Sequence, residues 1–289
     1  MPSSKFSLTA FLNEKFGGAP KQAPPAKVEN DSLAVGLKYR YETETAMIFN
    51  HQLTTYLPQR PAKLHLFFVQ GEELNHATQN GQQLLMRYFL EECDMKVSCF
   101  DESLFQDENL MQITLILKKA YEDLRERYEE DQFSFFAHSL AASPTVKCFS
   151  SLARQKSIPA PQKLILLSPW IDLSLSDPRM EALQELAGDQ NRFELKRLVE
   201  FYTAPFQPTD PQFELLDKNW ETVNELFVIT GTDDLLYPDT LKVKEKIRAS
   251  EKATLKAEIV AGQTHDFLLY DVYTQHKYLR KIHRFLKHG

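Results

Sequence analysis

Apolar residues in this chain fall into short continuous runs that alternate with longer segments of helical periodicity. The short runs are typical of strands in a parallel sheet, because such strands are covered on both faces. Strands are predicted over residues 63–69, 96–100, 133–136, 163–167, 226–230 and 255–260. Helices are predicted over residues 77–93, 109–128, 141–155, 238–250 and 271–287. Strands that alternate with helices in this way indicate a doubly wound α/β sheet.

The chain before the first buried strand has a different pattern. Residues 6–16 carry apolar side chains at the spacing of a short helix, and residues 17–31 are proline-rich, which predicts an extended linker. Two further strands are predicted between residues 33 and 58, where Leu37, Tyr39 and Tyr41 alternate with other residues. The chain is therefore divided into residues 1–32 and an α/β domain over residues 33–289.

One serine lies at a strand-to-helix turn. The run FSFFAHSLAA, residues 133–142, begins as an apolar strand and continues into a helical segment, with Ser139 between them. This is the local plan of a nucleophile elbow, usually spelled G-x-S-x-G, although Ala137 and Ala141 occupy the two glycine positions here. The competing interpretation is an ordinary serine at a turn. His138 fills the variable position of the motif and is expected to be a flanking residue.

Two later loops offer the groups that a serine nucleophile needs. A serine hydroxyl is a weak nucleophile until a base removes its proton and an acid orients the base. Asp234 follows strand 226–230, and His265 follows strand 255–260. Because parallel strands end at one edge of the sheet, both side chains are expected near Ser139. Asp233 competes with Asp234 for the position of the acid, and Asp239 can instead cap the next helix.

These motifs resemble those of the hormone-sensitive-lipase-like branch of the α/β-hydrolases. The runs LILLSPWIDLSLSDP (residues 164–178), GTDDLLYPD (residues 231–239) and GQTHDF (residues 262–267) stand in the order of that family. The resemblance implies an α/β-hydrolase fold: a mostly parallel central sheet, helices on both faces and a small helical cap. The cap is expected from the N-terminal segment and an insertion at residues 174–222.

By the same resemblance, Ser139 is the nucleophile, His265 the base and Asp234 the acid. The oxyanion hole is where the sequence departs from the family. The family carries a histidine and consecutive glycines there, whereas this chain has QGEE at residues 70–73. The backbone N–H groups of Gly71, Glu72 and Leu140 are the expected donors. Carboxylates that point into such a hole oppose the developing negative charge, and losing one donor costs about 10²–10³ in rate.

Two hypotheses follow for the function. In the first, the protein is a serine hydrolase of carboxylesterase or deacetylase type that cleaves a small acyl ester. In the second, it is a catalytically impaired pseudo-hydrolase that serves as a binding or scaffolding module. The QGEE run and the alanines beside Ser139 favour the second hypothesis. A peptidase or thioesterase on the same triad is a third class that the fold does not exclude.

The composition of the chain limits which partners and which cellular location are expected for the protein. The net charge is −6, so a nucleic-acid partner is not expected. No apolar run approaches the roughly 18 residues of a membrane span, and residues 1–15 lack the apolar core of a signal peptide. The three cysteines form no C-x-x-C pair, which is typical of reduced thiols in a cytoplasmic protein. A monomer or homodimer with a small-molecule ester substrate is expected.

No cofactor and no metal ion are expected from the sequence. The histidines outside the elbow and the last loop show no ligand-type spacing. They are His51, His65, His76, His276, His283 and His288.

Overall fold

The computed structural model describes most of the chain from Leu37 onward. The described residues are 37–71, 76–101, 103–155, 157–188, 190–216, 220–248, 254–270 and 276–288. The predictions for residues 1–32, a short helix and a linker, lie outside them.

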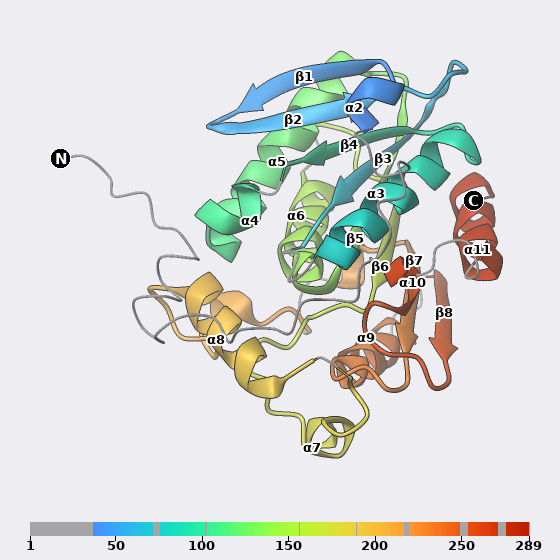
Figure 1. Cartoon of the computed structure of the whole chain (residues 1–289). Coiled ribbons are helices and arrows are strands. Elements are labelled where there is room, and N and C mark those ends of the chain that lie inside the picture. Colours follow the sequence, from blue (N-terminus) through green and yellow to red (C-terminus); the bar gives the residue numbers. More distant parts are fainter. Residues whose placement is uncertain are drawn as a thin grey trace.

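An eight-stranded sheet forms the centre of the described part of the chain (Figure 1). Its strands are β1 (Thr43–Ile48), β2 (His51–Tyr56), β3 (Leu64–Val69), β4 (Lys96–Phe100), β5 (Gln132–His138), β6 (Lys163–Leu167), β7 (Glu225–Gly231) and β8 (Thr254–Val260). Their spatial order is β1-β2-β4-β3-β5-β6-β7-β8. β2 pairs antiparallel with β1 and β4, and the other neighbours are parallel. The predicted mostly parallel sheet is confirmed.

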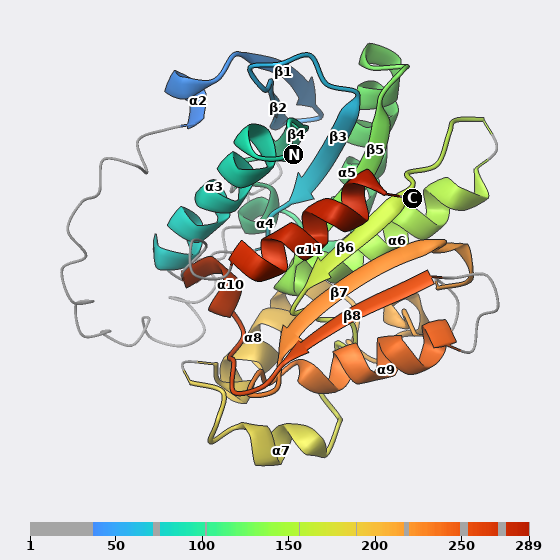
Figure 2. The same ribbon diagram turned by 90° about the vertical axis from the view of Figure 1, so that its right-hand side faces the viewer.

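Helices cover both faces of this sheet (Figure 2). On one face α3 (His76–Glu91) and α11 (His276–Lys287) bury a cluster that includes Phe68 and Phe136, whose rings stack at 4.6 Å. On the other face α5 (Leu110–Arg127), α6 (Ala142–Arg154) and α9 (Tyr237–Arg248) bury a cluster that includes Phe67 and Phe135. Adjacent residues of a strand point to opposite faces, so these continuous apolar runs supply both cores. Two short helices, α4 (Ser103–Asp107) and α10 (Phe267–Tyr270), accompany these longer ones.

The predicted strand around Leu37 is wrong. Residues Leu37–Arg40 form the short helix α2, and the two strands of this region are β1 and β2. Leu37 and Tyr41 are spaced for a helical turn as well as for a strand, and the N–H of Tyr41 donates to the Leu37 carbonyl at 3.1 Å. A short alternating run cannot separate the two periodicities.

The segment between β6 and β7 lies at the edge where the parallel strands end (Figure 1). It contains α7 (Arg179–Leu183), α8 (Arg192–Thr203), η3 (Pro211–Phe213) and η4 (Trp220–Thr222). The Tyr202 hydroxyl of α8 donates to the Phe105 carbonyl at 2.7 Å and fastens this segment to the body of the molecule. Its role as a cap, with the boundaries 174–222, stays a prediction.

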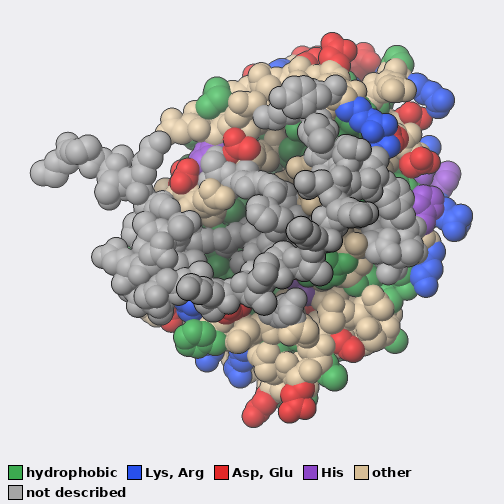
Figure 3. All heavy atoms as spheres, viewed as in Figure 1, with side chains coloured by type: hydrophobic (Ala, Val, Ile, Leu, Met, Phe, Trp, Pro, Cys, Tyr) green, Lys and Arg blue, Asp and Glu red, His purple; other side chains and the backbone are tan. Residues whose placement is uncertain are grey.

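Two features of the exterior bear on partners. On the face drawn in Figure 3, the described acidic and basic side chains are interspersed. Among the helices of the described ranges, none combines the length and apolarity that crossing a bilayer requires.

Candidate active site

Ser139 occupies a sharp turn between β5 and α6. β5 ends at His138, and Ser139 begins the single 3₁₀ turn η2 (Ser139–Ala141) with φ of 54°. Non-glycine residues seldom adopt this left-handed conformation, and it is the strained turn that a nucleophile elbow needs. The N–H of Trp170 donates to the Ser139 carbonyl at 3.0 Å and holds the turn from the side of β6. The Ser139 side chain is only partly buried, so it can be reached from outside.

The structure brings Ser139, His265 and Asp234 into one hydrogen-bonded line. The Ser139 Oγ lies 2.9 Å from the His265 Nε2. The opposite ring nitrogen, Nδ1, lies 3.0 Å from both carboxylate oxygens of Asp234. With the proton on Nδ1, the ring donates to Asp234 and presents the lone pair of Nε2 to the Ser139 hydroxyl.

The acid of this line is held ionised in a buried position. Asp234 has 0% of its surface exposed, and it accepts from the Leu236 N–H at 2.8 Å and the Thr230 hydroxyl at 3.2 Å. Burial raises the pKa of Asp234, but the charge of His265 and hydrogen bonds from His265, the Leu236 N–H and Ser168 outweigh it and leave that pKa below its ordinary value. Burial also lowers the pKa of His265, but the charges of Asp234 and Asp266 outweigh it and raise that pKa to about 9.

The register of the acid loop is decided by backbone hydrogen bonds. The N–H of Asp233 donates to the Gln263 carbonyl at 3.0 Å, and its side chain accepts from the Thr232 hydroxyl at 2.8 Å. Asp234, the next residue, is therefore the one that faces His265. The structure thus distinguishes between the two aspartates that the sequence left as competitors.

The side chain of Asp239 binds the loop after β6 instead of capping a helix. Its Oδ2 accepts from the N–H groups of Ile171 and Asp172 at 2.7 and 2.8 Å, which ties α9 to the loop after β6. Burial raises the pKa of Asp239 to about 7. Asp172 accepts from Lys242 at 2.6 Å in the same cluster.

Two further contacts hold the histidine loop, and sequence reasoning missed both. The Ser168 hydroxyl donates to the His265 carbonyl at 2.8 Å. Gly231 lies so close to the loop that a Cβ added there would meet the Gln263 carbonyl oxygen at 1.8 Å. The loop can therefore reach across β7 only because residue 231 has no side chain.

Two of the three expected oxyanion donors, Gly71 and Leu140, lie within the described residues. Gly71 is buried against the elbow: a Cβ added to it would lie 2.9 Å from the His138 carbonyl oxygen and 3.4 Å from the Ala141 nitrogen. Leu140 is buried in η2. Glu72 lies outside the described residues, so the oxyanion hole of Gly71, Glu72 and Leu140 stays a prediction.

A second pair of ionisable side chains adjoins the triad. His138 is 3% exposed, and its Nε2 lies 3.1 Å from the Asp266 Oδ1. The same oxygen lies 3.9 Å from the His265 Nε2, and the two histidine rings are 5.1 Å apart. One ligand atom from each of His138, His265 and Asp266 lies within 4.8 Å of the others, so these residues can hold a metal ion. The sequence signal was their position, since each of His138 and Asp266 is next to a triad residue.

A further Asp–His–Ser arrangement lies elsewhere in the sheet. The Ser98 Oγ is 2.7 Å from the His65 Nε2, and the His65 Nδ1 is 3.0 Å from the Asp131 Oδ2. Ser98 and His65 are both 0% exposed. Burial lowers the pKa of His65 to about 4. A substrate cannot reach this serine, so the arrangement is structural.

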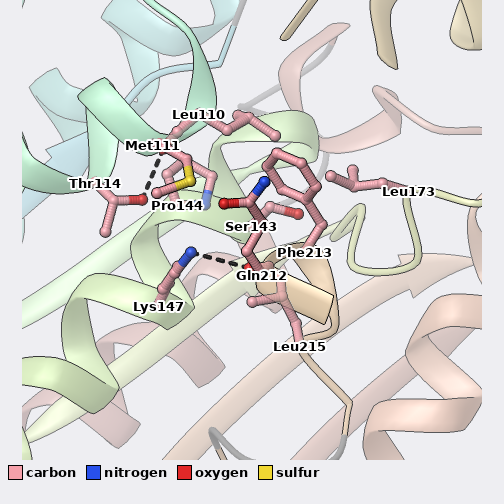
Figure 4. A pocket seen from close by; sticks show the side chains of 10 residues that line it. All are labelled: Leu110, Met111, Thr114, Ser143, Pro144, Lys147, Leu173, Gln212, Phe213 and Leu215. Atoms are coloured by element: carbon pink, nitrogen blue, oxygen red, sulfur yellow. Dashed lines mark hydrogen bonds between the residues drawn. The ribbon is translucent and has the colours of Figure 1, made fainter. Parts of the chain in front are cut away.

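A small, mainly apolar pocket lies between α5, α6 and the segment around η3 (Figure 4). It is lined by Leu110, Met111, Thr114, Ser143, Pro144, Lys147, Leu173, Gln212, Phe213 and Leu215. Lys147 donates to the Gln212 carbonyl at 2.9 Å and links the pocket wall to η3. Ser139, Asp234 and His265 do not line it, so this pocket is not the reaction site.

Comparison with known proteins agrees with the fold. Residues 146–269 match a family described as having the alpha/beta hydrolase fold. No curated protein sequence matches significantly.

Among solved structures, a candidate esterase from Staphylococcus aureus is similar with a TM-score of 0.74, 14% identity, and coverage of 97% of this chain and 90% of that chain. An esterase of the bacterial hormone-sensitive lipase family gives a TM-score of 0.72 and 15% identity, covering 86% of this chain and 84% of that one. The hormone-sensitive-lipase homologue EstE7, from a metagenome library, gives 0.73 and 15%, covering 86% of each chain. At such identities the similarity establishes the fold. This chain has the α/β-hydrolase fold, and structures of hormone-sensitive-lipase-like proteins are among those that it resembles.

Proposed function

We propose that the protein is a serine carboxylester hydrolase that cleaves a small acyl ester. One observation carries the proposal: a hydrogen-bonded line runs from the partly exposed Ser139 through His265 to the buried Asp234. The line combines a strained serine turn, a base within hydrogen-bond reach and an acid that orients the base, which together activate a hydroxyl.

The proposed reaction has two halves. Ser139 Oγ attacks the ester carbonyl while its proton passes to His265 Nε2, and Asp234 stabilises the imidazolium that forms. The oxyanion is bound by backbone N–H groups of Gly71, Glu72 and Leu140. His265 then gives its proton to the leaving alcohol, and an acyl group remains on Ser139. Water attacks this acyl group, His265 accepts its proton, and the proton returns to Ser139 as the acid leaves.

One observation favours the second candidate, a catalytically impaired pseudo-hydrolase. The carboxylate of Asp266 lies 3.9 Å from the His265 Nε2 and stabilises the protonated ring. A protonated His265 cannot accept the proton of Ser139. The two candidates therefore differ in whether His265 loses its proton under working conditions.

The experiment that tests the proposal is covalent labelling with a small fluorophosphonate, followed by intact mass. Wild type is compared with Ser139→Ala and with Ser98→Ala, a matched control that removes the serine of the buried Asp–His–Ser arrangement. Circular dichroism verifies that all three are folded. One adduct on wild type and on Ser98→Ala, and none on Ser139→Ala, is expected. A folded wild type that takes no adduct at pH 7 or at pH 9.5 would overturn the proposal and leave the pseudo-hydrolase.

Cytoplasmic location, a monomer or homodimer, and the absence of nucleic-acid and membrane partners remain part of this proposal. A peptidase or thioesterase on the same triad would be distinguished by comparing ester, peptide and thioester substrates.

A further inference from the structure

Three side chains with metal-binding atoms converge beside the nucleophile: His265, which belongs to the Ser139–His265–Asp234 line, and His138 and Asp266, which lie outside it. The Oδ1 of Asp266 lies 3.1 Å from the His138 Nε2 and 3.9 Å from the His265 Nε2. In a tetrahedral zinc site with bonds of about 2.1 Å, ligand atoms stand about 3.4 Å apart. The two separations bracket this value, and all three ligand atoms lie within 4.8 Å of one another, so side-chain rotations would bring them to zinc-binding distance.

The His138 ring is buried without a well-directed hydrogen bond. Within the described ranges, neither of its ring nitrogens nor the Asp266 Oδ1 has a hydrogen-bond partner, although the ion-pair distance between them is short. Leaving a buried polar group unpaired is unfavourable, because its lost hydration is not replaced. His138 is 3% exposed and directed at Asp266, so a ligand shared by these two residues would satisfy both.

His265 already has the second partner that a metal-binding histidine needs. Its Nδ1 bonds to Asp234 at 3.0 Å, so in the neutral ring the proton is on Nδ1 and the lone pair is on Nε2. Metal-binding histidines almost always carry such a carboxylate on the other ring nitrogen, because it orients the ring and raises its basicity. The acid that serves the triad would thus also support a metal bond at Nε2.

We infer that His138, His265 and Asp266 form a binding site for a divalent transition-metal ion of the zinc class, and that the bound ion inhibits the esterase. Two imidazoles and one carboxylate are a ligand set that zinc prefers, with the fourth position left to water. Binding uses the lone pair of His265 Nε2, the same lone pair that must accept the proton of Ser139 2.9 Å away. The inhibition rests on the proposed esterase function, whereas the binding does not.

Binding is tested with zinc chloride alone, added to metal-free full-length protein in a calorimeter. Wild type is expected to bind one zinc ion per chain. His138→Gln and Asp266→Asn each remove one ligand and should weaken binding by at least about tenfold, the lower limit for losing even an outer-shell partner. Ser139→Ala should bind as wild type does. His51→Gln is the matched control, because His51 also lies 3.1 Å from a carboxylate, that of Glu108.

Inhibition is tested on the same samples by fluorophosphonate labelling of Ser139 with and without zinc. Zinc should block the adduct on wild type and on His51→Gln, and a chelator should restore it. Unchanged zinc affinity in folded His138→Gln and Asp266→Asn would overturn the site. Zinc that binds there but accelerates labelling would overturn the inhibitory role. A wild type that binds one zinc ion but never labels would leave the site standing and refute the esterase function.

Discussion

The carboxylate of Asp266 lies 3.9 Å from the Nε2 atom of His265, the ring atom that faces the nucleophile. His265 thus stands between two carboxylates, with Asp234 on Nδ1. Both negative charges favour the imidazolium, which is the state that stabilises an intermediate but also the state that cannot start the reaction.

The dependence of kcat/KM on pH should reveal the effect of the second carboxylate, that of Asp266. His265 must be neutral to accept a proton, so kcat/KM should fall as the pH falls through its raised pKa of about 9. Asp266→Asn removes one of the charges that raise that pKa, so the midpoint of the acidic limb should move to lower pH. The measurement is kcat/KM for a nitrophenyl ester against pH. Glu258→Gln, which removes a carboxylate paired with Lys281 on the surface, should leave the midpoint unchanged. Equal midpoints in wild type and Asp266→Asn would contradict the prediction.

Asp234 and Asp233 should differ sharply in their effect on turnover. Asp234→Asn keeps the size of the side chain but loses the charge that orients His265, and such a change costs on the order of 10⁴ in kcat in a serine protease. Asp233→Asn, one residue earlier, should change kcat less than about threefold, because within the described part of the chain its side chain bonds to Thr232 and not to His265. Steady-state ester hydrolysis measures both. Similar losses in the two variants would mean that the assignment of the acid is wrong.

Gly231→Ala should destabilise the protein through a steric clash. The new methyl group would meet the Gln263 carbonyl oxygen at 1.8 Å, and forcing apart tightly packed groups costs typically 1–3 kcal/mol, occasionally more. Gly262→Ala is the control, since its Cβ would meet no atom within 4 Å and bears only the strain of its φ of 69°. The free energy of unfolding in denaturant should fall further for Gly231→Ala than for Gly262→Ala. The reverse order would refute the close-approach argument.

Asp239 should make stability depend on pH. Its folded-state pKa is raised from 3.8 to about 7, so its protonated form is the one that burial favours. The contribution is present below pH 3.8 and is lost as the pH rises toward 7. Asp239→Asn can still accept hydrogen bonds from Ile171 and Asp172 but does not titrate. Its stability relative to wild type should therefore rise between pH 4 and 7, which denaturant unfolding at several pH values measures. A constant difference would contradict the prediction.

The buried serine should matter for stability and not for turnover. Ser98→Ala leaves the Nε2 of His65 and the hydroxyl of Thr55 without their present partner, at 2.7 and 2.6 Å. Unpairing a buried polar group costs about 1–3 kcal/mol. Denaturant unfolding should show this loss, while kcat/KM stays within about twofold. A loss of turnover in a fully folded Ser98→Ala would mean that the serine has a role in the reaction.

Much of the fold was predictable because it rests on local patterns. The buried strands and most helices follow from continuous and periodic apolar runs, and their observed bounds differ from the predicted ones by a few residues. The site could be predicted for the same reason. Each of its residues, Ser139, Asp234 and His265, follows a strand that ends at the same edge of the sheet. The exception was Leu37–Arg40, where a short pattern fitted both periodicities.

Contacts between distant segments could not be predicted in this way. His138 and Asp266 are separated by more than a hundred residues, and their meeting depends on how the loop after β8 folds over the elbow. Likewise, Ser98, His65 and Asp131 come from three separate segments, and no spacing in the sequence indicates that they meet. The choice between Asp233 and Asp234 depended on a single backbone hydrogen bond to Gln263.

The two Asp–His–Ser arrangements show that interatomic distances alone do not identify a serine hydrolase. A three-residue template that measures only interatomic distances would retrieve Asp131–His65–Ser98 as readily as Asp234–His265–Ser139, since the distances are 3.0 and 2.7 Å in one and 3.0 and 2.9 Å in the other. What separates them is access: one serine borders solvent at a strained turn, and the other is sealed in the sheet. Any search for serine hydrolases therefore gains selectivity by scoring solvent contact and the φ of the serine beside the distances.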